Sequence, residues 1–196
     1  MPDHPTFGRY AEIPLDQMTA DQRRDYEYVI RERNRCPGPY KIWVENPPIM
    51  DLMVPLGAFY TNQSSTKQSS LNDTEIKIAT VIIVAKWGSA FAISEQELFA
   101  EGKGGYSTAD IPAEKVERMI IGLAVSFDDP RQQAIYDVST ALVNSRYVPK
   151  GLYDRAVKLL GNNGVTDLTV LIGYFTMVAL TLMFHDVPSY AEGMKR

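Results

Sequence analysis

Apolar residues recur along most of the chain every three or four positions, which is the spacing that places them on one face of a helix. Two stripes are especially regular, one from Val116 to Phe127 and one from Leu168 to Leu182. We find no alternating strand pattern and no internal repeat, so the sequence predicts an all-α fold. The predicted helices cover residues 19–33, 47–60, 72–87, 91–100, 112–127, 129–142, 149–160 and 168–184.

Several predicted helix boundaries carry capping signals. Thr19 stands three residues before Gln22, the spacing of a capping box, and Asn72 stands in the same way before Glu75. Gly161-Asn-Asn-Gly ends one helix. Proline and glycine predict a turn over residues 36–40, and polar residues predict a loop over 61–70. The chain therefore divides into an extended arm (1–18), one helical domain (19–187) and a short tail (188–196).

The segment from Glu75 to Trp87 is ambiguous by composition. Its β-branched residues suit a buried strand. Its length favours a helix, because strands seldom exceed about ten residues. The segment is apolar on all sides, so we expect this helix at the centre of the fold.

Charge and residue counts exclude several classes of function. The 196-residue chain has a net charge of −4 and no basic run, which argues against a nucleic-acid partner. One cysteine, Cys36, cannot form an internal disulfide or a Cys-x-x-Cys pair, and two histidines cannot build a multi-histidine metal site. We therefore expect no metal and no cofactor.

The uncharged stretch 168–184 is slightly short for a membrane span and has no basic flank. We interpret it as a buried helix rather than a span. The first residues do not resemble a signal peptide. These features predict a cytoplasmic protein with no membrane partner.

Four stretches carry a family resemblance: Gly38 to Pro47, Leu56-Gly57, Trp87 to Phe91, and Gly173 to Leu180. In this order they resemble the carboxymuconolactone decarboxylase and alkylhydroperoxidase D-like superfamily over about residues 7–190. The resemblance implies an alkylhydroperoxidase D-like helical bundle. It also implies a homotrimer, or a hexamer built from trimers, with pockets near the subunit contacts.

Family members typically carry a Glu and a His four residues apart after the tryptophan, and an earlier Glu at a helix start. Aligned through Trp87, the first two positions are Ala92 and Gln96 here. The early Glu matches Glu75 if the helix holds two extra residues; otherwise the position is Lys77. Alanine and glutamine do not titrate. Glu75 and Gln96 are the predicted catalytic residues.

Other residues are candidates for a substrate pocket, each with a structural alternative. Trp87 could wall the pocket or pack in the core. Either Glu95 or Glu97 could replace the missing acid, or both could lie on a solvated face. Glu45 could reach a neighbouring pocket or stay on the surface. Tyr106 could donate a hydroxyl proton or be an ordinary loop residue. Ser94 lies between the catalytic candidates and completes the predicted pocket set.

Two functions fit these observations. The first is a cofactor-free lyase, of decarboxylase or isomerase type, that acts on a small organic acid, lactone or aromatic-degradation intermediate by proton transfer. The second is a binding or scaffold protein that kept the fold and lost the Glu/His pair. A thiol peroxidase is excluded by the single cysteine.

Overall fold

The computed structural model describes residues 4–33, 35–61, 69–100, 111–144 and 147–189, without the side chains of Arg33, Phe99 and Ala100. Every regular element in these ranges is helical, apart from an isolated β-bridge between Phe7 and Tyr10. The predicted all-α class is therefore confirmed. After a 3-10 turn, η1 (Leu15–Gln17), the helices are α1 (Ala20–Arg33), α2 (Gly38–Trp43), α3 (Pro47–Thr61), α4 (Asp73–Trp87), α5 (Ala90–Ala100), α6 (Ala113–Ile120), α7 (Pro130–Val143) and α8 (Lys150–Phe184).

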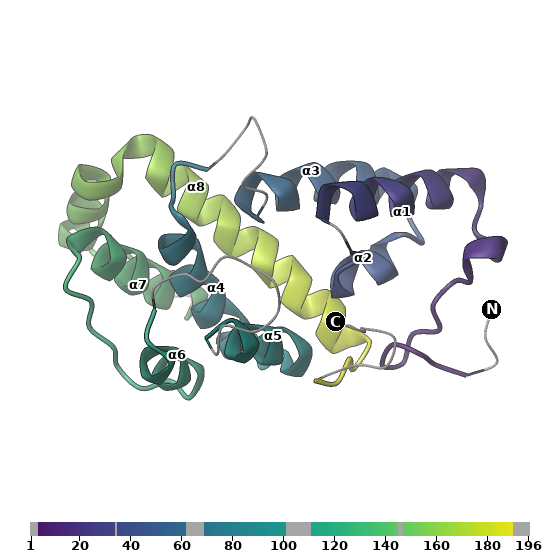
Figure 1. The fold of residues 1–196 in the computed structure, drawn as a ribbon. Helices are drawn as coiled ribbons and strands as arrows, with labels where there is room; N and C mark the ends of the chain where they lie inside the picture. Colours follow the sequence, from purple (N-terminus) through teal and green to yellow (C-terminus); the bar gives the residue numbers. More distant parts are fainter. Residues whose placement is uncertain (1–3, 34, 62–68, 101–110, 145–146, 190–196) are drawn as a thin grey trace.

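The long helix α8 runs diagonally through the molecule and contacts both of its ends (Figure 1). At one end α6 and α7 pack with α4, and at the other α1, α2 and α3 form a second group with the N-terminal arm. Gly161 interrupts α8 with a left-handed φ of 73°, a backbone conformation that glycine adopts without steric cost. The predicted break at Gly161 thus survives as a kink between two helical segments.

Helix α4 lies at the centre, as its composition predicts. It contacts α5, α6, α7 and α8, and residues Ile78 to Val84 are all buried. Asn72 and Glu75 form the predicted capping box, each side chain paired with the other's backbone N–H. Gly88 ends the helix in a left-handed conformation. Tertiary burial on all sides overrides the strand preference of the β-branched residues.

Three predictions of local structure were wrong. Residues 162–167, expected to separate two helices, are helical within α8. The helix expected to reach Phe127 ends at Ile120, and Gly122 follows with a left-handed φ of 77°. Val125 and Phe127 are buried in an irregular segment, whose backbone N–H groups donate to side chains of α7 instead. Residues 38–43, expected to lie in a turn and its continuation, form the short helix α2, because the proline at its start is compatible with the first helical turn.

The N-terminal arm packs against the far end of α8. Phe7 is fully buried and meets Phe91 edge to face, with ring centroids 5.6 Å apart. The backbone N–H of Arg9 donates to the carbonyl of His185 over 2.6 Å. The arm, predicted to be extended, contains a turn at Gly8 and the 3-10 turn η1, and its residues Phe7 and Tyr10 belong to the core that α2, α5 and α8 share.

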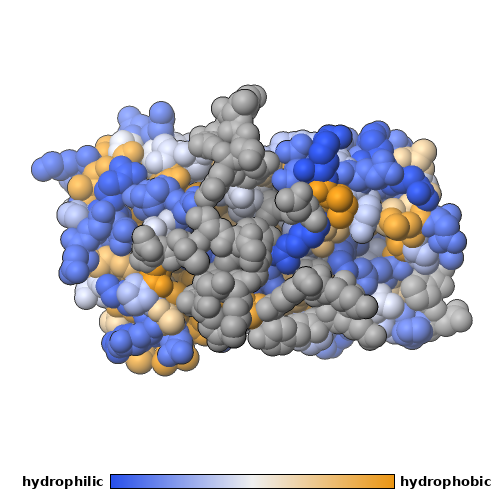
Figure 2. Space-filling view, viewed as in Figure 1, coloured by the Kyte–Doolittle hydropathy of each residue, from blue (hydrophilic) through white to orange (hydrophobic). Residues whose placement is uncertain are grey.

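The two faces of α8 differ in burial. Leu168, Leu171 and Leu182 are buried, whereas Leu180 is 43% and Phe184 80% exposed. Within the part of the chain that the structure describes, α8 is the helix long and apolar enough to cross a membrane, by length and composition alone. A second exposed apolar group, Ile121 and Leu123, follows α6 in the chain. Figure 2 shows apolar surface at the lower left, where Figure 1 places α6.

Candidate active site

A lysine and a glutamine from neighbouring helices meet inside the protein. The Nζ of Lys77, on α4, donates a hydrogen bond to Oε1 of Gln96, on α5, over 2.9 Å. Gln96 is 5% exposed. The two helices are held in contact because Gly88 turns the chain sharply between them. A flexible amine is therefore held at a partly buried position by a buried neutral amide.

Burial changes the proton affinity of this amine. Removal from water disfavours the ammonium form and lowers the pKa of Lys77 to about 7, while the negative charges of Glu95 and Asp73 oppose the shift. A lysine in this range holds both protonation states at neutral pH. It can therefore donate or accept a proton there, which an ordinary surface lysine does not do.

Glu95, whose negative charge acts on Lys77, is itself part of an ion pair. Glu95 binds the Arg35 guanidinium with an N–O distance of 3.1 Å, and both side chains are partly buried. Arg35 lies between α1 and α2, so this ion pair joins the first helices to α5. The Lys77 site thus combines a titratable amine, a neutral acceptor and a compensated ion pair.

Glu75 lies elsewhere, although it is only two residues from Lys77. Residues two apart on a helix point about 200° away from each other. Glu75 is 1% exposed and accepts hydrogen bonds from Arg131 Nε (2.7 Å) and Nη2 (3.2 Å). Its Oε2 also accepts from the backbone N–H of Asn72. The structure therefore separates Glu75 from Gln96 and engages it in a buried ion pair with α7.

The predicted pocket residues are dispersed. Trp87 is 37% exposed at the other end of α4, where its Nε1 donates to Thr176. It lies about 15 Å along the helix axis from Lys77, at about 1.5 Å per residue. Ser94 is buried and donates to the carbonyl of Phe91. Neither side chain makes a hydrogen bond to the Lys77–Gln96 pair in the part of the chain that is described.

Glu97 and Glu45 are exposed and make no hydrogen bond to this pair among the described residues. Glu97 is exposed on α5, next to Gln96 in sequence. Glu45 is exposed and accepts a hydrogen bond from the Tyr10 hydroxyl over 3.0 Å. Burial, and then this carboxylate, raises the pKa of Tyr10 well above its usual range. Tyr106 lies outside the described residues.

Sequence reasoning placed Gln96 among the catalytic candidates but gave Lys77 no role of its own. The signal was present, because the ungapped alignment through Trp87 places Lys77 where the family has its early glutamate. The Arg35–Glu95 pair had no such signal, since 60 positions separate its members in sequence. Within the described ranges, no cluster of three or more histidine, cysteine or carboxylate side chains is arranged to hold a metal ion.

No family model matches this chain, and no curated protein sequence matches it. Its fold is similar to that of the debrominase Bmp8, whose crystal structure was determined in the apo form. The TM-score is 0.61, over 92% of this chain and 91% of that chain, at 12% sequence identity. At this identity the similarity establishes a shared fold and carries no information about the reaction.

Proposed function

We propose that the protein is a cofactor-free lyase of the carboxymuconolactone decarboxylase-like type, with Lys77 as its acid–base group and Gln96 as the residue that positions it. The observation that carries this proposal is the partly buried hydrogen bond between the two side chains. The family resemblance supports it, because both residues occupy positions where family members carry acid–base groups. The substrate would be a small organic acid, such as a β-keto acid or a carboxylated lactone.

In the proposed decarboxylation, the Lys77 ammonium lies beside the carbonyl oxygen of the substrate. The bond between the α-carbon and the carboxylate breaks, CO₂ leaves, and the electron pair passes to the carbonyl as an enolate. The ammonium stabilises this developing charge in a water-poor site. It then transfers its proton to the α-carbon, and the neutral amine regains a proton from solvent. Gln96 accepts a hydrogen bond from Lys77 and so keeps the amine in position.

The test compares Lys77→Arg with Lys86→Arg, an exposed lysine on the same helix. Arginine keeps the positive charge but does not release a proton at accessible pH. On a panel of β-keto acids and carboxylated lactones, Lys77→Arg should still bind the acids and should lose turnover at least about 100-fold. Lys86→Arg should match the wild type. Equal turnover in both variants would contradict the proposal.

The pH profile gives an independent readout. Because the ammonium form is required, kcat/KM should fall as the pH rises above the Lys77 pKa of about 7. Gln96→Glu places a carboxylate beside the amine, raises its pKa and moves this alkaline limb to higher pH. A limb that stays in place in Gln96→Glu would show that another group controls the reaction.

A binding protein is the second candidate, and the non-titrating Ala92 and Gln96 favour it. Such a protein would bind the same acids without turning them over. Acids that raise the melting temperature of the wild type, while leaving it inactive toward every one of them, would support binding and reject the lyase.

The proposal includes self-association through the exposed face of α8. This face carries Met177, Leu180 and Phe184, and no charged side chain interrupts it between Leu168 and Phe184. Burial of these residues against a second copy would remove apolar surface from water. The family resemblance implies a homotrimer or hexamer. Binding of the purified protein to phospholipid vesicles would instead assign this face to a membrane.

A further inference from the structure

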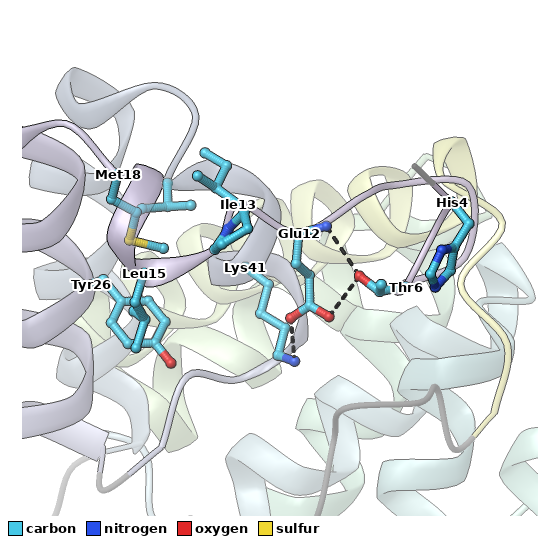
Figure 3. A pocket seen from close by; sticks show the side chains of 10 residues that line it. His4, Thr6, Glu12, Ile13, Leu15, Met18, Tyr26 and Lys41 are labelled. Atoms are coloured by element: carbon cyan, nitrogen blue, oxygen red, sulfur yellow. Dashed lines mark hydrogen bonds and ion pairs between the residues drawn. The ribbon is translucent and has the colours of Figure 1, made fainter. Parts of the chain in front are cut away.

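A cavity of about 460 Å³ lies between the N-terminal arm, α1 and α2. Its size falls in the range of small-molecule sites in proteins. Neither Lys77 nor Gln96 lines it, so it is distinct from the proposed active site. Figure 3 shows side chains from the arm and from both helices pointing into the same space.

An ion pair lies in the middle of this cavity. Lys41 Nζ binds Glu12 Oε1 over 2.6 Å, and the side chains are 10% and 27% exposed. The second carboxylate oxygen, Oε2, accepts from the Thr6 hydroxyl over 3.0 Å. Thr6 in turn accepts from the backbone N–H of Glu12, which fixes the bend of the arm. These bonds hold the polar groups in place before any ligand arrives.

The cavity has an apolar end on one side of this ion pair. In Figure 3, the side chains to the left of Lys41 and Glu12 are those of Ile13, Leu15, Met18 and Tyr26. The side chains of Thr6 and His4 lie to the right. Val44, which is buried, also lines the cavity. Burial raises the pKa of Tyr26, so its phenol stays neutral and can donate a hydrogen bond.

The charges of Lys41 and Glu12 compensate each other. A charged ligand would bring a third charge into a partly desolvated space and leave it without a partner. A neutral hydroxyl avoids this cost, because each carboxylate oxygen can accept two hydrogen bonds. An alkyl group attached to that hydroxyl would fill the apolar end and leave water.

We propose that this cavity is a binding site for an uncharged amphipathic molecule, with a hydroxyl head on the Lys41–Glu12 pair and an alkyl or aryl group against Ile13, Leu15 and Met18. The matched probes are 1-octanol, octanoate and octylamine, which differ only in the charge and chemistry of the head. Isothermal titration calorimetry at pH 8 measures the three affinities. Wild-type protein should bind octanol at least about tenfold more tightly than either charged probe.

Two substitutions should change this preference in opposite directions. Glu12→Gln removes the negative charge beside Lys41, so the affinity for octanoate should increase roughly tenfold relative to that for octanol. Lys41→Met removes the positive charge beside Glu12, so the affinity for octylamine should increase instead. Glu97→Gln, at an exposed carboxylate outside the cavity, is the control and should preserve the wild-type order. Lys77→Arg should also preserve it, which separates this site from the proposed lyase chemistry.

Circular dichroism establishes that each variant is folded. If Lys41→Met does not fold, the octanoate affinity of Glu12→Gln decides the question alone. Absence of octanol binding to the wild type would overturn the proposal. So would an unchanged order of the three probes in a folded Glu12→Gln protein, since the ion pair would then have no part in recognition.

Discussion

Replacing Glu75 with glutamine distinguishes a carboxylate that supports the fold from one that performs the chemistry. Glutamine keeps the size of the side chain and removes its charge. In the structure Glu75 receives three hydrogen bonds, two from Arg131 and one from the backbone of Asn72. The amide retains one acceptor oxygen, and its NH₂ group faces the Arg131 guanidinium. The substitution therefore breaks the ion pair, while the amide oxygen can still accept from the backbone N–H of Asn72 and keep the capping box.

The magnitude follows from these contacts. Breaking a fully buried ion pair costs about 3–5 kcal/mol. The Arg131 side chain is 36% exposed and also donates to the carbonyl of Leu159, so water and this bond relieve part of the loss. We expect Glu75→Gln to lower the free energy of unfolding by about 2–3 kcal/mol. For a domain of this size that corresponds to about 4–12 °C in Tm.

Thermal and urea unfolding measure this change, with Glu97→Gln as the control for the loss of one exposed carboxylate. The control should stay within about 0.5 kcal/mol of the wild type. Turnover of the folded Glu75→Gln protein should persist, because Lys77 is untouched. A variant with wild-type stability and no activity would refute the reasoning and restore Glu75 as the general base predicted from the sequence.

Three further predictions test other parts of the structure. The pKa of Lys77 is 10.5 in the unfolded chain and about 7 in the folded protein, so the unfolded chain binds more protons between these pH values. The free energy of unfolding should therefore rise with pH across this window. The urea midpoint should rise between pH 7 and pH 9 in the wild type, and by less in Lys77→Met. A Cβ at Gly57 would lie 2.5 Å from the Tyr174 hydroxyl and closer still to that of Tyr40, so Gly57→Ala should lose about 1–3 kcal/mol in the same assay, whereas Gly173→Ala, which meets no neighbour, should not. Leu180→Arg, on the exposed face of α8, should reduce the mass measured by light scattering; a wild-type protein that is already monomeric would contradict the proposed interface.

The fold could be predicted from the sequence where capping residues and glycines mark helix ends that the tertiary structure keeps. The capping residues at Asn72 and the glycine at 161 act through the backbone of their own helix, so they are visible without tertiary information. The apolar stripe that ends at Phe127 wrongly predicted a helix up to that residue. An irregular segment can also bury apolar side chains at helical spacing, because side chains of α7 accept hydrogen bonds from its backbone N–H groups. Hydrophobic periodicity therefore indicates which side chains are buried. The backbone conformation depends in addition on which groups pair with the backbone N–H and C=O.

The candidate site was less predictable, because it depends on the direction in which side chains leave a helix. Glu75 and Lys77 are both charged residues near the start of α4, and of these two only Glu75 was predicted from the sequence to be catalytic. Packing separates them: Arg131 of α7 engages one, and Gln96 of α5 engages the other. Neither partner could be assigned from sequence spacing, because they lie 56 and 19 positions away.

The missing Glu/His pair of the superfamily that the sequence resembles and the presence of Lys77 can be connected chemically. Positions 92 and 96 are one turn apart on α5 and share a face. A carboxylate at position 92 would add negative charge near the amine, favour its ammonium form and oppose the effect of burial. Ala92 and Gln96 supply no such charge, so desolvation is the largest influence on Lys77. In the proposed lyase, Ala92 and Gln96 thus leave burial as the largest influence on Lys77, and the lowered pKa of this lysine suits proton exchange near neutral pH.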